Sequence, residues 1–331
     1  MNLSERILGC LTGLAVGDAL GMPTEMLTQE QIHAEFGWVD GLKSAPSWHP
    51  HHLLVPGRVT DDTGQALSVA HAFGPDGNIS AVTVAKELLK WADQEKDILD
   101  LVLGPSTRQA LKELRKGGDP RQTGQHGNTN GAAYRAVAIG LVNVHHPERL
   151  IEQVVEVCLP THGTSVAISG AAAVAAAIVE ACQEHSTLES ITTAAIENAV
   201  EGRKHGAWVW STPLEGRITL AVDLVRQNPE PVTALKNIAD YVGVDMLVPE
   251  SVAAIFGIIS LANGDPMKAA IYGANIGGDT DTIAALAGAI CGAWRGSTTI
   301  DPVMVNEIEK VSKIDLKAEA KHLEKMVEAN R

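Results

Sequence analysis

Aromatic residues are scarce in this sequence: phenylalanine, tryptophan and tyrosine together make up 4% of its 331 residues. The cores of β-sandwiches and β-barrels are usually rich in aromatic and β-branched side chains, so this scarcity argues against an all-β fold. Segments in which apolar and polar residues alternate convincingly are also missing. Alanine and glycine are abundant instead, and such small side chains suit closely packed helices. The composition therefore favours an all-α protein.

Cysteine is rare as well, with four residues and no Cys-x-x-Cys pair. Cys158, Cys182 and Cys291 lie in apolar stretches with helical spacing, which indicates small buried thiols in a reducing compartment. The His-Glu-x-x-His pattern of many zinc enzymes is absent too. We therefore do not expect a zinc site.

Basic residues are in short supply: 26 Lys and Arg face 40 Asp and Glu, for a formal net charge of −14. Binding to nucleic-acid phosphates needs a basic surface, and no run of Lys or Arg provides a local one. We therefore expect no nucleic-acid partner. The surplus of carboxylates indicates a well-solvated surface and leaves some carboxylates available for cations.

No apolar run is a convincing membrane span. The best candidate, 166–182, is short for a bilayer, contains Glu180 and is mostly alanine, so a buried central helix is expected. Near the N-terminus, Ile7-Leu8-Gly9-Cys10 faintly resembles a lipoprotein cleavage site, but Glu5 and Arg6 leave no apolar region before the cysteine. The chain is therefore expected to be cytoplasmic, with no membrane partner.

Helical periodicity dominates the remaining pattern. Apolar residues spaced three and four apart from Leu3 to Ala15 predict a first helix, which Gly21-Met22-Pro23 should end. No linker or fixed-period repeat divides the chain, so residues 1–331 are predicted to form one domain. Further helices are predicted, to within ~2–4 residues at each end, over 63–73, 80–94, 106–116, 131–143, 147–158, 164–183, 187–203, 213–227, 232–241, 249–263, 267–274, 281–294, 302–311 and 315–329.

Two short segments concentrate oxygen atoms that could bind metal: Thr60-Asp61-Asp62-Thr63 and Asp279-Thr280-Asp281-Thr282. Each precedes an apolar-periodic helix, so either one alone could simply be a helix N-cap. Capping uses one side-chain oxygen, however, whereas each segment supplies two carboxylates and adjacent hydroxyls. Neighbouring carboxylates on a helix point in different directions and can therefore reach two different cations. Taken together, the segments predict a site for two hard cations such as Mg²⁺.

The break before the second acidic segment contains Gly277 and Gly278, which permit positive φ angles and close backbone approach. They indicate either a tight turn between helices or a place where the backbone passes close to a ligand. A second irregular segment, 37–58, holds His49, His51 and His52. These histidines have no matching set of partners in the sequence, so we expect surface or lid residues.

In combination these segments resemble the ADP-ribosylglycohydrolase family, which includes the dinitrogen-reductase-activating glycohydrolase. Residues 13–21 (Gly-Leu-Ala-Val-Gly-Asp-Ala-Leu-Gly), followed by Glu25, resemble its N-terminal signature. Residues 60–63 and 277–282 resemble its two metal motifs. Residues 130–135 resemble its substrate loop, which usually has Met where Tyr134 stands, and Thr161-His162 before an alanine-rich helix resembles another family element.

The resemblance implies an all-α, orthogonal multi-helix bundle with a binuclear Mg²⁺ or Mn²⁺ centre that hydrolyses an N-glycosidic bond at the ribose C1″ carbon. It implies that Glu25 lies beside the metals, near the attacking water or the ribose hydroxyls, and that Asp61 and Asp281 are catalytic. The implied metal ligands are Thr60, Asp61, Asp62, Asp279, Asp281 and Thr282. The implied substrate-binding residues are Asn130, Gly131, His162, Gly277 and Gly278.

Asp18 and His162 each allow a structural and a functional interpretation. Asp18 either orients metal ligands or is a buried carboxylate that caps a neighbouring backbone segment. His162 begins the most apolar stretch of the chain, where a lone histidine is more often structural. The family resemblance favours a ligand contact for His162.

Two departures from the family pattern concern the substrate. The loop reads Thr129-Asn130-Gly131 where protein-directed members usually have Gly-Asn-Gly, and Gln125-His126-Gly127 lacks the acidic residue that some members place there. Two substrate classes stay open: an ADP-ribosylated group, including one on a protein, and a small nucleoside-like riboside. An ADP-ribose-binding or crystallin-like structural protein without turnover is the alternative function, against which the complete set of candidate ligands argues.

Overall fold

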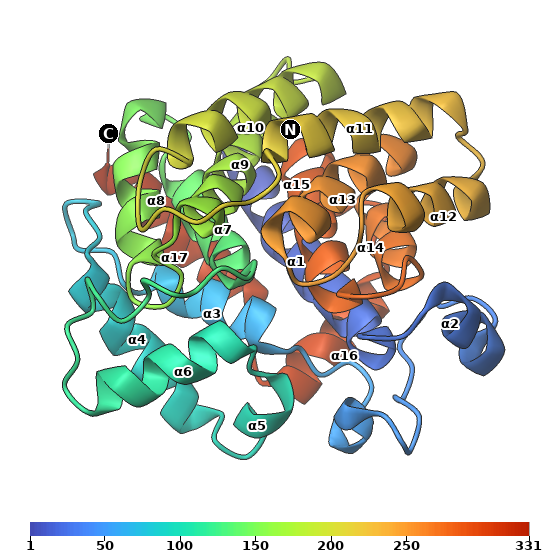
Figure 1. Cartoon of the computed structure of the whole chain (residues 1–331), viewed down its shortest axis with the longest axis horizontal. Coiled ribbons are helices and arrows are strands. Elements are labelled where there is room, and N and C mark those ends of the chain that lie inside the picture. Colours follow the sequence, from blue (N-terminus) through green and yellow to red (C-terminus); the bar gives the residue numbers. More distant parts are fainter. Residues whose placement is uncertain (331) are drawn as a thin grey trace.

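The computed structural model describes residues 1–330, and helices make up almost all of its regular structure (Figure 1). Among these residues the only β-type pairings are two isolated bridges, Thr129 with Leu247 and Thr164 with Ala207. The all-α prediction is therefore confirmed. The α-helices are α1 (Leu3–Gly21), α2 (Gln29–Phe36), α3 (Asp61–Ala70), α4 (Ala81–Gln94), α5 (Leu99–Val102), α6 (Pro105–Arg115), α7 (Gly131–Val142), α8 (Leu150–Cys158), α9 (Ser165–Ala181), α10 (Leu188–Gly202), α11 (Leu214–Gln227), α12 (Pro231–Tyr241), α13 (Val248–Ala262), α14 (Pro266–Ala274), α15 (Thr280–Arg295), α16 (Pro302–Ser312) and α17 (Leu316–Ala329). Short 3-10 helices lie at η1 (Met22–Thr24), η2 (Pro50–Leu53) and η3 (Pro147–Arg149).

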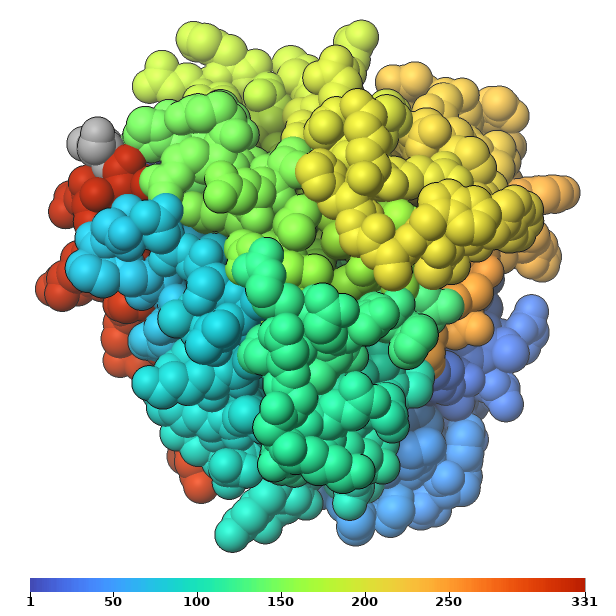
Figure 2. Space-filling view, turned by 60° about the vertical axis from the view of Figure 1, so that its left-hand side comes forward, coloured from blue at the N-terminus to red at the C-terminus, as the bar shows by residue number. Residues whose placement is uncertain are grey.

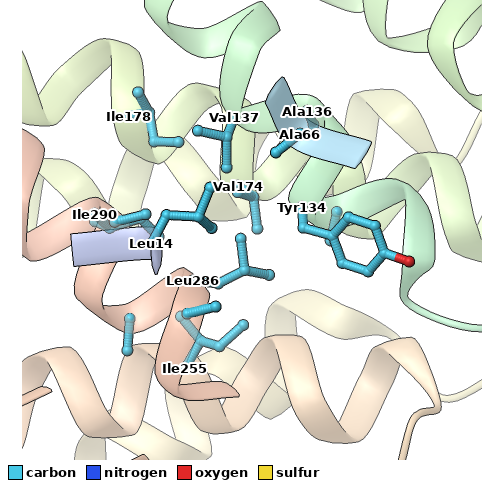
Figure 3. Close-up of a cluster of buried hydrophobic side chains, with 14 of the residues drawn as sticks. Leu14, Ala66, Tyr134, Ala136, Val137, Val174, Ile178, Ile255, Leu286 and Ile290 are labelled. Carbon is cyan, nitrogen blue, oxygen red and sulfur yellow. The ribbon is translucent and has the colours of Figure 1, made fainter. Parts of the chain in front are cut away.

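Helices α1, α7, α9, α13 and α15 form the centre of the bundle. Nearly all of their residues are buried, as expected for helices that are apolar on every face. Figure 3 shows where their larger side chains meet: Leu14, Val137, Val174, Ile255 and Leu286 each come from a different central helix. All five side chains are fully buried. The hydrophobic core therefore lies where these five central helices meet.

The central helices α1 and α15 pack antiparallel, with their backbones in contact. Glycines recur at every fourth position of α1, at Gly9, Gly13, Gly17 and Gly21, so they share one helix face. A Cβ atom added at Gly13 would lie only 2.1 Å from the carbonyl oxygen of Gly288. This glycine face brings the C-terminal end of α1 against the N-terminal end of α15, where the second acidic segment lies.

Helices α3 to α6 form a layer beside the central helices. In Figure 2 the blue to teal segments of this layer fill the lower part of the visible face, and green to yellow segments fill the upper part. Helix α3 packs on both α4 and α7. The first acidic segment, at the start of α3, therefore lies where this outer layer meets the core.

One stretch of the described residues, Leu3–Thr24, is long and apolar enough to cross a membrane by length and composition alone. Its apolar window is 94% buried inside the structure, against α14, α15 and α17. The sequence pointed instead to 166–182, which forms α9, the buried central helix that was predicted. The glycine and alanine content of α1 explains why it packs as a core helix.

Predicted and observed helix ends agree closely. The largest differences are at 147, where a 3-10 turn precedes the α-helix that begins at Leu150, and at 73, where α3 ends at Ala70. Helices α2 and α5 were not predicted. Helix α2 buries only Ile32, so it lacks an apolar periodicity. Its capping box, in which Thr28 and Gln31 bond reciprocally, was the available signal.

Candidate active site

The first acidic segment is held in place by a carboxylate from another helix. Asp18, fully buried on α1, accepts hydrogen bonds from the backbone N–H groups of Thr60 (2.9 Å) and Thr63 (3.0 Å) and from the Thr63 hydroxyl (2.6 Å). Burial raises the pKa of Asp18, and the hydrogen bonds from Thr63 and Thr60 oppose that shift. The capping interpretation of Asp18 is therefore confirmed: it caps the start of α3, the segment that carries Asp61 and Asp62.

Thr60 is the N-cap residue of α3, and its hydroxyl oxygen accepts a hydrogen bond from the Asp62 N–H at 3.4 Å. The carboxylates of Asp61 and Asp62 are not needed for that cap. Asp61 Oδ2 accepts from the Tyr134 hydroxyl (2.7 Å) and from Gln65 Nε2 (2.9 Å), which leaves Oδ1 available. Asp62 Oδ1 is buried and has no hydrogen-bond partner among the described residues.

The second acidic segment begins α15. Asp279 is its N-cap residue but makes no side-chain capping bond; its Oδ2 accepts a hydrogen bond from Asn130 Nδ2 instead. Asp281 Oδ1 accepts from the Thr282 N–H at 2.9 Å. The capping alternative therefore leaves most of the carboxylate oxygens of this segment unexplained.

A tight turn ties Glu25 to this second segment. Gly277 and Gly278 have φ angles of +87° and +69°, and a Cβ at Gly278 would lie 2.3 Å from the Val244 carbonyl oxygen. The Gly278 carbonyl accepts from the Met26 N–H (2.7 Å), and its own N–H donates to the Leu27 carbonyl (2.9 Å). The turn interpretation of the two glycines is the one that the structure favours.

The acidic side chains converge on one point. Glu25, Asp279 and Asp281 each offer an oxygen atom, and these atoms lie within 4.8 Å of one another. Burial raises the pKa of Glu25, and the neighbouring carboxylates of Asp279 and Asp61 raise it further. Burial likewise raises the pKa of Asp61 to about 7. Without a cation, such a cluster cannot be fully ionised.

These residues fit hard divalent cations. All of the available ligand atoms are carboxylate, hydroxyl or carbonyl oxygens, which Mg²⁺ and Mn²⁺ prefer. A cation would also give a partner to Asp62 Oδ1, a buried oxygen of a cleft-lining residue that has no hydrogen-bond partner among the described residues. Burial, followed by the charges of Asp61 and Asp18, raises the pKa of Asp62 well above its usual range. A bound cation would relieve both conditions.

A cleft opens onto the acidic cluster. Most of the residues proposed from the sequence line it, together with residues from α6 and α7. The lining residues are Glu25, Asp61, Asp62, Val102, Gly104, Pro105, Thr107, Thr129, Asn130, Gly131, Tyr134, His162, Met246, Asp279, Asp281 and Thr282. No lysine or arginine is among them. Burial lowers the pKa of His162, and Arg135 lowers it further, so His162 is neutral.

Three residues proposed from the sequence lie outside this lining. Gly277 and Gly278 line a neighbouring cavity, and the carbonyl and N–H groups of Gly278 are bonded to the segment after Glu25. Thr60 borders a groove on the other side of α3. Its hydroxyl still lies 3.3 Å from Asp62 Oδ2.

Of the two alternatives expected for the histidines in segment 37–58, surface or lid residues, the surface one is wrong for two of the three. His49 and His51 are each only 2% exposed. His49 Nε2 lies 2.7 Å from the Glu25 carbonyl oxygen, and His51 Nε2 lies 3.1 Å from Glu25 Oε2. This loop folds back because carbonyl groups after α1 need hydrogen-bond donors; His51 Nδ1 also lies 3.0 Å from the Met22 oxygen.

Sequence reasoning also missed two groups that bond the candidate ligands. Figure 3 shows Tyr134 at the edge of the core cluster, with its hydroxyl pointing away from it, and that hydroxyl donates to Asp61. Gln65 donates to the same oxygen from one turn further along α3. The i, i+4 spacing of Asp61 and Gln65 was a usable signal for this bond.

Comparisons with known proteins agree with this geometry. A model of the family described as ADP-ribosylglycohydrolase matches residues 1–331. The Escherichia coli (strain K12) protein YegU is 34% identical over 325 residues, which cover 97% of each chain. The ADP-ribosyl-[dinitrogen reductase] glycohydrolase of Rhodospirillum rubrum is 27% identical over 162 residues, covering 49% of this chain and 52% of that protein.

A solved structure named "ADP-ribosylglycohydrolase-related protein complex" shares the fold, with a TM-score of 0.69 at 24% identity over 98% of this chain and 99% of that one. The helical architecture and the two acidic segments at the starts of α3 and α15 thus accompany a sequence match that spans the whole chain. This chain belongs to the ADP-ribosylglycohydrolase family, a family of hydrolases.

Proposed function

We propose that the chain is a metal-dependent N-glycosyl hydrolase that releases ADP-ribose or ribose from an ADP-ribosylated or nucleoside-like substrate. The observation that carries this proposal is the cluster of Glu25, Asp61, Asp62, Asp279 and Asp281, with a buried Asp62 oxygen that has no partner in the described residues. Packing alone gives no reason to gather these carboxylates at one cleft. Hydrolysis of a glycosidic bond gives one.

Two divalent cations, Mg²⁺ or Mn²⁺, would be held by Asp61 through Oδ1, by Asp62, Asp279 and Asp281, and by the hydroxyls of Thr60 and Thr282. When bound, such ions position substrate oxygens and make water a better nucleophile at neutral pH. The second oxygen of Asp61 and one oxygen of Asp279 are engaged by protein donors, which holds each carboxylate in one orientation.

Glu25 is the proposed proton acceptor. Water forms a bond to C1″ as the C1″–N bond breaks; the proton lost by water goes to a Glu25 oxygen, and Glu25 then releases that proton, which the leaving nitrogen gains directly or through solvent. The place of Glu25 in the cleft, beside Asp279 and Asp281, suits a group that must take up and then release a proton. His51 contacts the Glu25 carboxyl, and His49 contacts the Glu25 carbonyl oxygen. These two contacts keep the carboxyl directed at the cluster.

We propose that small nucleoside-like ribosides are cleaved at least as well as ADP-ribosyl-arginine on a protein. A pyrophosphate needs cationic side chains or a cradle of backbone N–H groups, and no lysine or arginine among residues 1–330 lines the cleft. The Thr129 side chain lines it where a smaller residue would leave more backbone accessible. Bound cations and the start of α7 would still favour an anion, so both substrate classes belong in the test.

The decisive experiment is a substrate panel with Mn²⁺ or Mg²⁺. Free nucleosides, ADP-ribose derivatives and an ADP-ribosylated protein would be assayed under one metal condition, and released ribose would be separated from released ADP-ribose. Release of ADP-ribose from the protein with no cleavage of any nucleoside would contradict the substrate proposal. Tight binding of ADP-ribose without cleavage of any substrate would support the alternative of a binding or crystallin-like protein.

A further inference from the structure

A fully buried arginine lies directly beneath the candidate active site. Arg135, on α7, is 0% exposed, and its guanidinium forms no ion pair with a carboxylate among the described residues. All of its hydrogen bonds go to neutral acceptors. These acceptors are Gln65 Oε1 (from Nε at 2.8 Å and also from NH2), Thr107 Oγ1 (2.8 Å), Thr161 Oγ1 and His162 Nδ1 (3.2 Å).

An arginine side chain can only donate hydrogen bonds and is always charged. The atoms that face Arg135 must therefore be acceptors, which removes an ambiguity in both neighbouring residues. Gln65 must turn its oxygen to Arg135, so its amide nitrogen faces Asp61 Oδ2 at 2.9 Å. His162 Nδ1 lies 3.2 Å from an Arg135 N–H donor and 2.8 Å from Thr161 Oγ1, which itself accepts from Arg135. A lone pair on Nδ1 accepts from Arg135 and from the Thr161 hydroxyl, so this arrangement favours a single ring proton on Nε2.

The proton on His162 Nε2 sets a direction for the next hydrogen bonds. His162 Nε2 lies 3.0 Å from Thr129 Oγ1, and the Thr129 hydroxyl donates to Ser106 Oγ at 3.0 Å. The imidazole therefore donates a hydrogen bond to the Thr129 oxygen, and the single hydroxyl proton of Thr129 is donated to Ser106. The Thr129 hydroxyl has no proton left to give to a phosphate oxygen in the cleft.

We propose that Arg135 is a positioning residue for the candidate active site. It determines which atoms donate and which accept in two chains of hydrogen bonds, the two arms. One arm runs through Gln65 to Asp61, and the other runs through His162 to Thr129 and Ser106. A buried guanidinium polarises the groups bonded to it, so each arm presents a donor to its target. The consequence of this arrangement for turnover rests on the proposed function, whereas the hydrogen-bond directions do not depend on that function.

The first test reads the tautomer of His162 directly in metal-free protein. Histidine labelled with ¹⁵N gives distinct signals for a protonated and an unprotonated ring nitrogen, and the His162→Gln variant identifies the signals of His162. The expected result is an unprotonated Nδ1 and a protonated Nε2. A protonated Nδ1 would overturn the proposal, with no variant of Arg135 required.

The second test compares Arg135→Met with a matched control, Arg6→Met. Arg6 is also buried and also bonds only neutral acceptors, the carbonyl oxygens of Ala181, Ala293 and Trp294, but none of these three residues lines the cleft. In folded Arg135→Met, the His162 tautomer preference should be lost and the Kd for Mn²⁺ should rise about 10–100-fold. Arg6→Met should change neither.

Unchanged tautomer and Mn²⁺ affinity in folded Arg135→Met would overturn the proposal, as would equal effects in both variants. If Arg135→Met does not fold, Arg135→Lys keeps the charge but loses the planar fork; retention of both the wild-type tautomer and the wild-type Mn²⁺ affinity in it would overturn the proposal. Protein with the expected tautomer that binds no Mn²⁺ and cleaves no substrate would refute the proposed function while supporting the arrangement around Arg135.

Discussion

Asp18 and Glu25 belong to the same short stretch of chain yet act on the site in different ways. Asp18 acts through the backbone of Thr60 and Thr63 and faces away from the cleft, since its oxygens are occupied by those donors. Glu25 lies in the cleft, with its carboxyl near those of Asp279 and Asp281. Substitutions at Glu25 should therefore report on chemistry, whereas substitutions at Asp18 should report on metal geometry.

Glu25→Gln should slow turnover far more than it weakens metal binding. It removes the proposed proton acceptor but none of the proposed metal ligands, and loss of such a group typically costs about 10²–10⁴ in rate. The measurement is kcat beside the Kd for Mn²⁺, with Glu30→Gln on exposed α2 as the control. Normal turnover in Glu25→Gln would mean that the residue takes no proton.

Asp281→Ala should abolish activity and leave a folded, helical protein. Among residues 1–330, the Asp281 carboxyl accepts a single backbone hydrogen bond, a local one from the Thr282 N–H, and its pKa is raised by burial and by the charges of Glu25 and Asp62. Removing it relieves repulsion, so the metal-free variant should melt no earlier than the metal-free parent. Thermal melting with circular dichroism checks this. Loss of helicity would show instead that the segment serves mainly as a cap.

At the scale of whole elements, the pairing of α1 with α15 decides where the acidic segments meet. The backbones touch along Gly9, Gly13, Gly17 and Gly21, so the two helices can hardly slide or separate without losing that fit. Asp18 and the second acidic segment lie near the same end of this helix pair. The geometry of the metal site is therefore coupled to the register of two helices, and small residues set that register.

Gly13→Ala should destabilise the protein by about 1–3 kcal/mol, the usual cost of forcing an extra carbon atom into a packed core. The added Cβ would meet the Gly288 carbonyl oxygen, a backbone atom that cannot rotate away. Gly216 lies on α11, where an added Cβ would have no neighbouring atom within 4 Å. Gly216→Ala is therefore the matched control and should leave the stability of the protein unchanged or raise it. Equal melting temperatures for the two variants would contradict backbone contact between α1 and α15.

The contact of α3 with α17 should make stability depend on pH. The hydrogen bond from His71 to Glu319 raises the pKa of His71 above 6.5, with Lys90 and Glu87 as nearby charges of opposite effect. The contribution of this hydrogen bond to the free energy of unfolding is complete below the pKa that His71 has in the unfolded chain. It disappears as the pH rises through the pKa that His71 has in the folded protein. The difference in melting temperature between wild type and His71→Gln should therefore shrink from about pH 6 to 8. A constant difference would rule this linkage out.

For the whole molecule, the buried carboxylates make stability depend on divalent metal. A ligand that binds only the folded state stabilises it by mass action, by about 2.7 kcal/mol at a free concentration a hundred times the Kd. Adding Mn²⁺ or Mg²⁺ should thus raise the melting temperature, and exhaustive chelation should abolish turnover. Asp281→Ala is the control in which the metal-induced rise should be reduced. Full turnover after chelation would refute the two-metal proposal.

Local pattern was enough to predict most elements of this fold. Apolar residues at helical spacing and the glycine and proline stops predicted nearly every helix, because periodicity and capping are properties of neighbouring residues. Helix α2 escaped prediction because it lies on the surface and buries only Ile32. The two acidic segments were also visible, because several oxygen-bearing side chains stood together before a helix start.

Contacts between distant segments could only be decided by the tertiary structure. Nothing near His51 in the chain indicates that its ring meets Glu25, and nothing near Arg135 indicates that it bonds both Gln65 and His162. Composition and periodicity predicted an all-α chain with two acidic helix starts. Packing decided that these starts meet, because Asp18 on α1 holds the start of α3 and the glycines of α1 let the backbone of α15 approach closely.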